Sequence, residues 1–273
     1  MTSPDPSADV AAGIAPDATP VPDPVPPAIE LCGLRAAYGR IEVLRGVDLS
    51  VPAGSVFALL GRNGAGKSTT LKVISGQIMP TAGDIRLSGH NVKGARTGPL
   101  ARAGVCLVPE GRGVFPGLTV RDNLRLMTYT GTSRGMVEHR AYERFPRLRE
   151  RRNQLAGTMS GGEQQMLALA RGLATDPAIL LLDELSMGLA PIIVEELYQH
   201  VAAIARDGVT VVVVEQFART VLAVADVAAH MDHGRIIRVG EPHVLAAELA
   251  EAYFGSGESP ENDEGHRAPT SRS

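Results

Sequence analysis

Residues 55–75 read SVFALLGRNGAGKSTTLKVIS, and this stretch decides the fold. Residues 55–60 form an apolar run of strand length, and the pattern of residues 67–75 predicts a helix. Between them, residues 61–68 (GRNGAGKS) satisfy the pattern G-x-x-x-x-G-K-[ST]. A strand, a glycine-rich turn and a helix in this order predict a loop that binds nucleotide phosphates; the alternative is a glycine-rich turn that binds nothing.

Each residue type in this loop has a physical reason to be there. Gly64 and Gly66 permit backbone conformations that aim successive N–H groups at phosphate oxygens, and the following helix offers its positive end. Lys67 is expected to reach the β- and γ-phosphates, and the Ser68 hydroxyl to take one Mg²⁺ position. The loop alone does not distinguish kinases, GTPases and other NTPases. Its expected ATP-binding residues are Gly61, Arg62, Asn63, Gly64, Ala65, Gly66, Lys67, Ser68 and Thr69.

Strand-length apolar runs alternate with helical patterns after the loop. The further predicted strands are 104–109, 178–182 and 210–215, and the further predicted helices are 160–174, 193–205 and one that begins at 219. This alternation predicts an α/β fold with a mostly parallel sheet and right-handed crossovers. An antiparallel β subdomain is predicted from the short runs 29–34, 43–51 and 84–87, and an inserted helical lobe at about 116–175.

The two ends of the chain differ from its middle. Residues 1–27 are rich in proline and residues 255–273 are polar, so both are expected to be disordered tails that cannot bury enough apolar surface to order. Residues 28–254 suit one large domain. A net charge of −3 gives no basic field for nucleic acid, so no nucleic-acid partner is expected.

The cysteines and the N-terminus suggest a compartment. Cys32 and Cys106 lie in apolar, strand-like contexts without a CxxC pattern, and they are predicted to be buried thiols in a reducing compartment. The N-terminus lacks the basic and apolar regions of a signal peptide, and no apolar run is long enough to cross a bilayer. Any membrane function is therefore expected to act through a partner chain.

Three further motifs follow the phosphate-binding loop. Residues 160–165 read SGGEQQ, residues 179–184 read ILLLDE, and Gly188 and Leu189 come soon after. In this order and spacing they resemble the signature, the Walker B strand and the D-loop of ATP-binding-cassette (ABC) ATPases, and the resemblance covers about residues 28–254. It implies the ABC nucleotide-binding form of the P-loop NTPase fold, with ATP and Mg²⁺ as cofactors.

The two carboxylates at the end of the Walker B stretch imply hydrolysis. Asp183 is expected to hold Mg²⁺ through water and Glu184 to orient the attacking water, since phosphoryl transfer needs mainly positioning and charge neutralisation. An adjacent Asp-Glu pair by itself is also compatible with a solvated strand end. The resemblance implies a head-to-tail dimer, in which the helix N-terminus that binds the ATP of a second subunit comprises Ser160, Gly161, Gly162 and Glu163.

Other positions match or depart from the family's pattern. Tyr38 matches the aromatic residue that stacks on adenine. Glu110 stands where most members have Gln, and is expected to bind Mg²⁺ or water. Gln216 stands where most have a switch His, and is expected to hydrogen-bond the γ-phosphate without carrying charge. Leu185 stands where Pro is usual. The expected catalytic residues are Lys67, Glu184 and Gln216.

Longer stretches carry a closer resemblance. They are 108–115 (VPEGRGVF), 145–152 (FPRLRERR), 156–167 (AGTMSGGEQQML), 187–193 (MGLAPII), 214–216 (VEQ) and 252–255 (AYFG). Together they resemble the smaller ATPase of high-affinity branched-chain amino acid importers. This implies a place on the cytoplasmic face of the membrane, docked on permease subunits and served indirectly by an extracytoplasmic substrate-binding protein. The second ATPase is either a paralogue or another copy of this chain.

The match to this subfamily is imperfect, and other hypotheses about the function stay open. Departures from its pattern occur at Gly113, Leu185, Met187 and Phe217. The related importers of urea and amides usually keep Gln at positions 110 and 163, where this chain has Glu. ABC ATPases of translation or DNA repair usually carry two cassettes or long coiled coils. A non-catalytic binding module would leave the phosphate loop and both carboxylates without a role.

Overall fold

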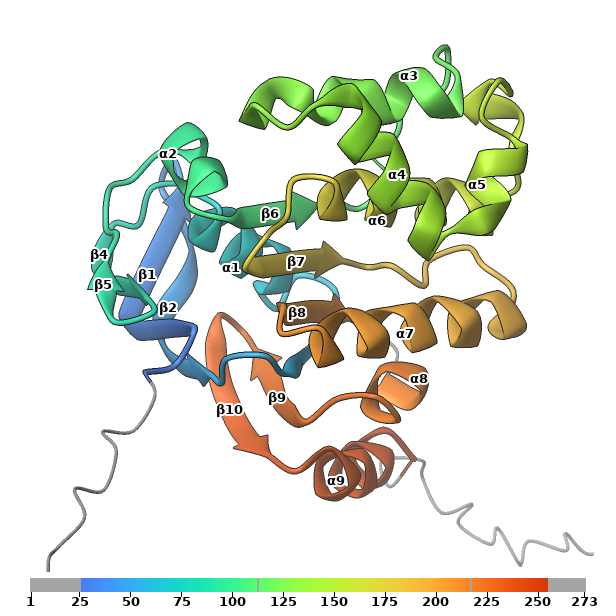
Figure 1. Cartoon of the computed structure of the whole chain (residues 1–273). Helices are drawn as coiled ribbons and strands as arrows, with labels where there is room; N and C mark the ends of the chain where they lie inside the picture. The colour runs from blue at the N-terminus through green and yellow to red at the C-terminus, as the bar shows by residue number, and fades with distance from the viewer. Residues whose placement is uncertain (1–25, 112, 217, 255–273) are drawn as a thin grey trace, which may run out of the picture.

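The apolar run before the glycine-rich turn forms strand β3 (Val56–Leu60), inside a six-stranded sheet of order β10-β9-β3-β8-β7-β6 (Figure 1). The computed structural model describes residues 26–111, 113–216 and 218–254. Neighbouring strands from β9 to β6 pair in parallel, and β10 pairs antiparallel with β9. Every residue of β3, β7 and β8 is buried, as expected for strands covered on both faces. The predicted α/β fold with a mostly parallel sheet is confirmed.

Helices and a second sheet cover this central sheet. The remaining central strands are β6 (Val105–Val108), β7 (Ile179–Asp183), β8 (Thr210–Glu215), β9 (Val227–Asp232) and β10 (Arg235–Gly240). The helices that connect and cover them are α1 (Lys67–Ile74), α2 (Thr97–Arg102), α6 (Gly161–Leu173), α7 (Pro191–Arg206), α8 (Ala218–Leu222) and α9 (Pro242–Phe254). The second sheet has the order β2-β1-β4-β5 and consists of β1 (Ile29–Tyr38), β2 (Ile41–Val51), β4 (Ala82–Leu87) and β5 (His90–Asn91).

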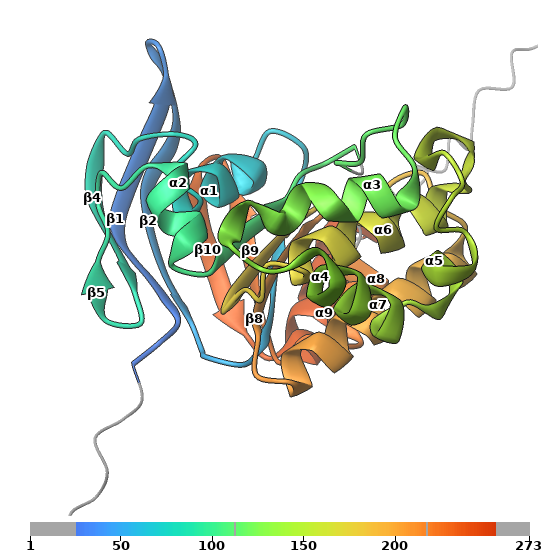
Figure 2. The ribbon, with the colours of Figure 1, turned by 45° about the horizontal axis from the view of Figure 1, so that its top comes forward.

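The two faces of β3 belong to two apolar cores, because successive side chains of a strand point to opposite faces. Phe57 and Leu59 share one core with α1 and with the antiparallel sheet. Val56, Ala58 and Leu60 share the other core with α6, α7 and the helical lobe. Helix α1, which carries the end of the phosphate-binding motif, is therefore held between the two sheets (Figures 1 and 2).

A group of short helices follows β6 and forms the helical lobe, at the upper right in Figure 1. It contains α3 (Val120–Arg125), the 3₁₀ turn η1 (Leu126–Thr130), α4 (Arg134–Arg144), α5 (Pro146–Glu150) and the 3₁₀ turn η2 (Ala156–Thr158). The predicted range of about 116–175 also includes α6, which packs against β6 of the central sheet and is described separately from this lobe. Among the described residues of this lobe, the only β pairing is an isolated bridge between Thr119 and Leu155. The fully buried Asn123 ties the lobe to the chain after β6, since its Oδ1 accepts from the Phe115 N–H at 2.8 Å.

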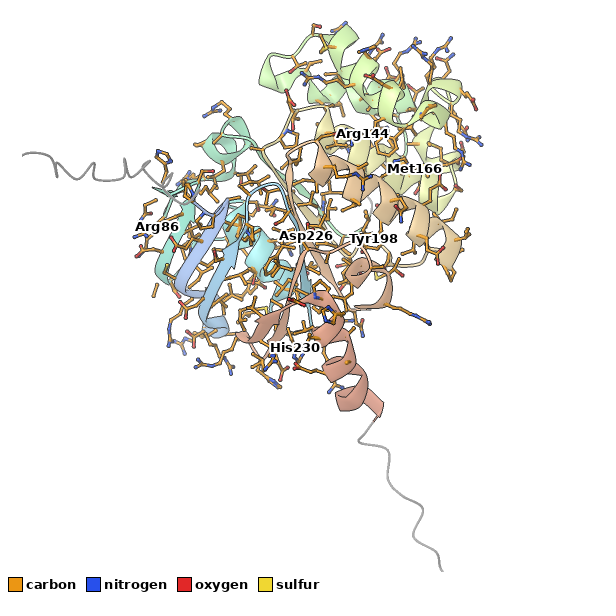
Figure 3. All side chains as sticks on the ribbon, turned by 60° about the horizontal axis from the view of Figure 1, so that its bottom comes forward. Arg86, Arg144, Met166, Tyr198, Asp226 and His230 are labelled. Carbon is orange, nitrogen blue, oxygen red and sulfur yellow. The ribbon has the colours of Figure 1, made fainter. Side chains whose placement is uncertain are left out.

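Three helices carry the contact between the lobe and the central sheet. Arg144, Met166 and Tyr198, labelled in Figure 3, come from α4, α6 and α7, and these helices pack in that order. Met166 and Tyr198 are buried. Helix α6 therefore lies between the lobe and α7, and its first turn carries the SGGEQQ stretch.

Several strands and helices after β8 and beside β4 are not predicted from the sequence. The β9–β10 hairpin turns at His233 and Gly234, whose φ angles of 45° and 79° fit the two-residue turn that joins twisted strands. Helices α2 and α9 were also missed. Cys32 and Cys106 are free thiols, but they are partly buried rather than buried as predicted. Burial raises the pKa of the Cys106 thiol to about 11.

Some predictions lie beyond this description. Apart from Pro26 and Pro27, the predicted tails fall outside the described residues, as does Phe217. Within the described part of the chain, every helix is too short or too polar to span a lipid bilayer.

Candidate active site

The glycine-rich loop joins β3 to α1 and curls around the ammonium group of Lys67. Lys67 Nζ donates to the Gly61 carbonyl at 2.8 Å and to the Arg62 carbonyl at 3.3 Å. The lysine is buried, with only 4% of its surface exposed. Gly66 has a φ of 112°, and a Cβ there would lie 3.0 Å from side-chain atoms of Leu44 and Met231. The positive φ favours glycine at this position, and a Cβ would in addition displace these two side-chain ends slightly.

The ends of three parallel strands bring the predicted catalytic residues to one edge of the sheet. Leu60 pairs with Glu215 and Asp183 pairs with Val214, so β3, β8 and β7 end at the same level. Ligands of open α/β sheets bind in the crevice outside this carboxyl edge. Lys67, which follows β3, reaches across β8 toward the residues that follow β7.

Two contacts join the phosphate loop to the Walker B carboxylates. Ser68 Oγ donates to Asp183 Oδ1 at 2.8 Å, and Lys67 Nζ lies 3.8 Å from Glu184 Oε1. Asp183 is buried and Glu184 is partly buried. The four residues 67, 68, 183 and 184, distant in sequence, therefore form one cluster.

Burial sets the electrostatics of this cluster. It lowers the pKa of Lys67, although the charges of Glu184, Asp183, Glu215 and Glu110 act in the opposite direction. Burial also raises the pKa of Asp183, against its hydrogen bond from Ser68, and the pKa of Glu184, against the Lys67 charge. Both partners of the Lys67–Glu184 contact thus shift toward their neutral forms, so their mutual attraction at 3.8 Å does not offset desolvation. Shifts of this kind in a crevice mark candidate catalytic groups.

The Ser68 and Asp183 oxygens fit a Mg²⁺ site. Both are oxygen donors, the ligand type that Mg²⁺ prefers. The hydrogen bond of 2.8 Å between them places them close enough to serve one ion, with Asp183 acting directly or through a water. Mg²⁺ in nucleotide sites usually takes one or two protein groups together with water and phosphate oxygens. Among the described residues there is no group of three or more His, Cys, Asp or Glu suited to a metal.

The other predicted residues around the loop are less fixed. Glu110 is exposed in the segment after β6, and its charge acts on the pKa values of Lys67, Asp183 and Glu184. Gln216 is exposed directly after β8. Tyr38 is the last residue of β1 and its side chain is 48% exposed, as a ring that stacks on a base requires.

The predicted signature turn opens α6 with a capping box. Glu163 N–H donates to Ser160 Oγ at 3.4 Å, and Ser160 N–H donates to Glu163 Oε2 at 3.0 Å. Glu163 also pairs with Arg151 at 2.7 Å. These bonds stay on the turn's own side and do not reach the phosphate loop. A Cβ on Gly162 would lie 2.4 Å from Ile193 Cγ2, so this glycine also has a packing reason, the close approach of α6 to α7.

One buried carboxylate at the same edge is not among the site residues predicted from the sequence. Glu215 ends β8, is 2% exposed, and accepts hydrogen bonds from Ser186 and Tyr198. The available signal was a lone acidic residue closing an otherwise apolar buried strand, directly before Gln216.

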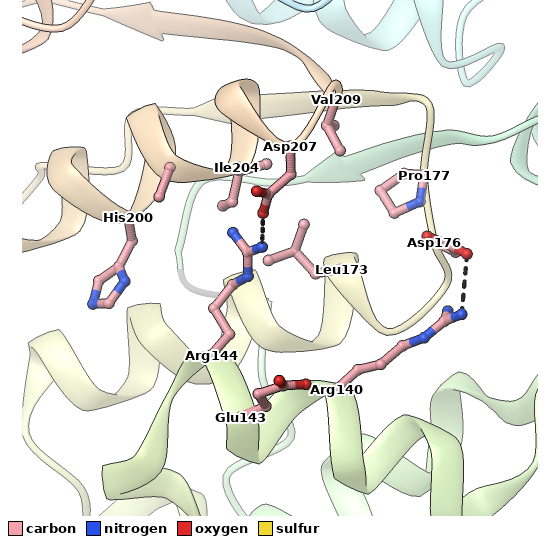
Figure 4. Close-up of a pocket in the computed structure, with 11 residues that line it drawn as sticks. Arg140, Glu143, Arg144, Leu173, Asp176, Pro177, His200, Ile204, Asp207 and Val209 are labelled. Atoms are coloured by element: carbon pink, nitrogen blue, oxygen red, sulfur yellow. Dashed lines mark hydrogen bonds and ion pairs between the residues drawn. The ribbon is translucent and has the colours of Figure 1, made fainter.

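A cavity of about 580 Å³ lies away from this cluster, between α4, the α6–β7 connection and the end of α7 (Figure 4). Arg140 pairs with Asp176 at 3.1 Å and Arg144 pairs with Asp207 across this space. None of the predicted site residues lines it. Its two arginines pair with its two aspartates between the lobe and the core. The converging groups at Lys67, and not the cavity's size, therefore locate the candidate site.

Comparison with known proteins gives a consistent result. A profile of the ABC transporter family matches residues 44–186. The high-affinity branched-chain amino acid transport ATP-binding protein BraG of Pseudomonas aeruginosa is 42% identical over 222 residues, which cover 80% of this chain and 95% of that protein. The probable branched-chain amino acid transport ATP-binding protein LivF of Archaeoglobus fulgidus is 34% identical over 216 residues, covering 78% and 91%.

Relatives with other printed functions are about as similar in sequence to this chain as LivF is. Nod factor export ATP-binding protein I of Ralstonia nicotianae is 33% identical over 222 residues, covering 80% of this chain and 68% of that protein. A solved ATP-binding cassette of an ABC transporter, in its ADP conformation, has a TM-score of 0.76 at 24% identity, covering 85% of this chain and 99% of the other. The solved structure supports the fold alone. Identity near 33% therefore does not separate import from export.

Proposed function

The chain belongs to the ABC transporter family of ATP-binding subunits, and from that premise we propose that it powers the import of branched-chain amino acids through a partner permease. The family binds ATP and couples its hydrolysis to transport, so the chain is an ATPase that yields ADP and phosphate. The observation that carries the substrate class is the 42% identity to BraG across 95% of that protein. Relatives with other printed functions, such as the Nod factor export proteins, are 33–34% identical.

The proposed reaction assigns one role to each group of the cluster. Lys67 binds the β- and γ-phosphates, whose negative charge offsets the desolvation that lowers the pKa of this buried lysine. Glu184 orients and polarises the attacking water, and Gln216 hydrogen-bonds the γ-phosphate. Ser68 and Asp183 hold Mg²⁺, with Glu110 beside them. The ion, when bound, neutralises charge on the β- and γ-phosphates.

The proposed assembly is a head-to-tail pair of cassettes docked on permease subunits at the cytoplasmic face of the membrane. Family relatives act as ATP-binding subunits of transporters, which supports a permease partner. In the pair, the turn formed by Ser160, Gly161 and Gly162 binds the ATP held by the other subunit's loop. Its exposed Ser160 N-terminal cap is compatible with this contact. An extracytoplasmic substrate-binding protein delivers the amino acid to the permease.

Reconstituted transport tests the proposal. The chain, a paralogous cassette and their permease are placed in proteoliposomes, with leucine-loaded binding protein on the side opposite the ATP. ATP-dependent uptake of labelled leucine, together with faster hydrolysis when loaded binding protein is present, is the expected result. The same vesicles carrying Glu184→Gln provide the control without turnover. Stimulation by urea instead of leucine would favour the related urea and amide importers, and hydrolysis that ignores permease and substrate would reject the transport assignment.

A further inference from the structure

We propose that Glu215 is a positioning residue for ATP hydrolysis, whose buried carboxylate holds the segment after Glu184 and thereby sets the direction of the Glu184 side chain. The inference rests on the role proposed above for Glu184. It concerns Ser186, Tyr198 and Glu215, three residues from different elements to which the sequence-based predictions assign no role.

Both oxygens of the Glu215 carboxylate accept hydrogen bonds. Its Oε1 accepts from the Ser186 N–H at 2.9 Å and from the Tyr198 hydroxyl at 2.6 Å, and its Oε2 accepts from the Ser186 hydroxyl at 2.9 Å. Glu215 and Tyr198 are 2% and 1% exposed. Hydrogen bonds to a carboxylate are shorter and stronger than neutral ones, and a buried carboxylate without such donors is costly. We call this arrangement the Glu215 clamp.

The clamp takes over where the backbone ladder between β7 and β8 ends. Glu184 N–H still donates to the Val214 carbonyl at 3.0 Å, which continues the ladder one residue past β7. The next anchored N–H, that of Ser186, donates to the side chain of Glu215 and not to a backbone carbonyl. The chain can therefore leave the sheet at Glu184 while both sides of that residue stay fixed.

Glu184 itself has an unusual backbone conformation. Its φ is +47°, in the left-handed region that residues with a Cβ avoid. Such a conformation costs about 1–3 kcal/mol and persists only where the surrounding contacts determine it. Three consecutive residues supply those contacts: Glu184 bonds to Val214, the Leu185 carbonyl accepts from Gln165 Nε2 at 3.2 Å, and Ser186 bonds to Glu215. The contact of Ser186 with Glu215 consists of two hydrogen bonds, one from the N–H and one from the hydroxyl of Ser186. Of these three contacts, it alone has a carboxylate as the acceptor.

Position in the chain connects the clamp to a second part of the reaction. Glu215 directly precedes Gln216, the residue proposed to contact the γ-phosphate. One buried side chain therefore fixes both the segment that carries Glu184 and the end of the strand that carries Gln216. Loss of the clamp is expected to misplace these groups without touching the loop that binds ATP, and a misplacement of about 1 Å can cost roughly 100-fold in rate.

The experiment compares kcat and ATP affinity in the full chain, within whichever assembly hydrolyses ATP. Glu215→Gln keeps the shape but removes one acceptor, and it should lower kcat at least about 10-fold while ATP affinity stays within about 2-fold. Tyr198→Phe and Ser186→Ala, which each remove one bond, should lower kcat by smaller factors. Because Glu215 acts through Ser186, Ser186→Ala/Glu215→Gln should be no slower than Glu215→Gln alone.

Thr210→Val is the matched control on the same strand. Thr210 opens β8 at the opposite end, is 3% exposed, and its hydroxyl accepts from the Gly54 N–H at 2.9 Å. This variant should lose stability but keep kcat. Equal loss of kcat in Thr210→Val would reduce the clamp to a general structural role. A kcat within 2-fold of the parent in Glu215→Gln, or effects of Ser186→Ala and Glu215→Gln that simply multiply, would also overturn the proposal.

Two further arms keep the test decisive. If Glu215→Gln fails to fold, Tyr198→Phe and Ser186→Ala carry the same comparison, and unchanged kcat in both overturns the proposal. Glu184→Gln is measured in parallel. Normal turnover by that variant would remove Glu184 from its proposed role independently of the clamp.

Discussion

Replacing Lys67 with Met should leave the nucleotide-free protein about as stable as the parent while removing most of its stabilisation by ATP. Lys67 Nζ is bonded to two carbonyls and lies 3.8 Å from Glu184, yet burial lowers its pKa. A lysine whose pKa falls on folding holds its proton less tightly in the folded chain than in the unfolded one. Burial therefore disfavours the charged form of this side chain, and Met fills a similar volume without the charge.

The magnitude follows from linkage. A nucleotide at 100 times its Kd stabilises the parent by about 2.7 kcal/mol, which raises Tm by roughly 5–11 °C for a domain of about 150–250 residues. Losing charge-assisted bonds to phosphate, each worth about 1.5–3 kcal/mol, lowers affinity by roughly 100-fold. The same nucleotide concentration then stabilises the variant by only about 0.4 kcal/mol, a shift of about 1–2 °C.

The assay is thermal unfolding with and without a non-hydrolysable ATP analogue. The chain has no tryptophan, so circular dichroism or calorimetry follows the transition. Lys93→Met is the matched control, because Lys93 pairs with Asp84 at the surface at 3.5 Å, away from the loop. A full nucleotide shift in Lys67→Met would refute the assignment of the loop. A large loss of stability in nucleotide-free Lys67→Met would refute the electrostatic argument.

The sign of the pH dependence provides a second check on Lys67. Because its folded pKa lies below its ordinary value of 10.5, the unfolded chain binds more protons between those two values, and stability due to this group rises with pH in that window. Lys67→Met should remove this contribution and leave a flatter curve than the parent. An unchanged curve in the nucleotide-free variant would mean that burial does not disfavour the charged lysine.

Three other predictions address separate contacts. Glu184→Gln should bind ATP but hydrolyse it at a small fraction of the parent rate and accumulate as a dimer in size-exclusion chromatography; normal turnover would exclude Glu184 as the residue that orients water. Ser160→Arg should abolish turnover but leave ATP binding by each separate chain intact, and normal turnover would contradict a head-to-tail site. Gly162→Ala should lower the free energy of unfolding by about 1–3 kcal/mol, because its Cβ would lie 2.4 Å from Ile193 Cγ2; chemical denaturation checks this, and failure of Ile193→Ala to restore stability would show that the clash is elsewhere.

The sequence predicts those parts of the fold whose signals are local. Strand β3, the glycine-rich loop and α1 follow from one continuous stretch, and β8 occupies the predicted residues 210–215. The β9–β10 hairpin was missed because β9 mixes apolar and polar residues, and it becomes a strand by pairing with β3 in the central sheet. In its turn, His233-Gly234, only the glycine is a residue typical of two-residue hairpin turns.

The residues of the candidate site likewise fall into those that local sequence patterns predict and those that only the fold brings together. Lys67, Ser68, Asp183 and Glu184 are recognisable from motifs, because each motif is contiguous. The partners of Glu215 lie 29 and 17 positions away along the chain. Only the parallel order of β7 and β8 and the packing of α7 bring them together. A sequence pattern therefore indicates the charged residue but not what it holds.

The departure at position 185 gives the clamp a physical context. Most family members have Pro there, which fixes φ and restricts the chain directly after the catalytic Glu. Leu185 lacks that restriction of φ, and its side chain is buried. The same segment in this chain is held by hydrogen bonds, from Gln165 to the Leu185 carbonyl and from Ser186 to Glu215. Restoring Pro at position 185 is therefore expected to reduce the dependence of kcat on Glu215, since a covalent restriction would then do part of what the clamp does.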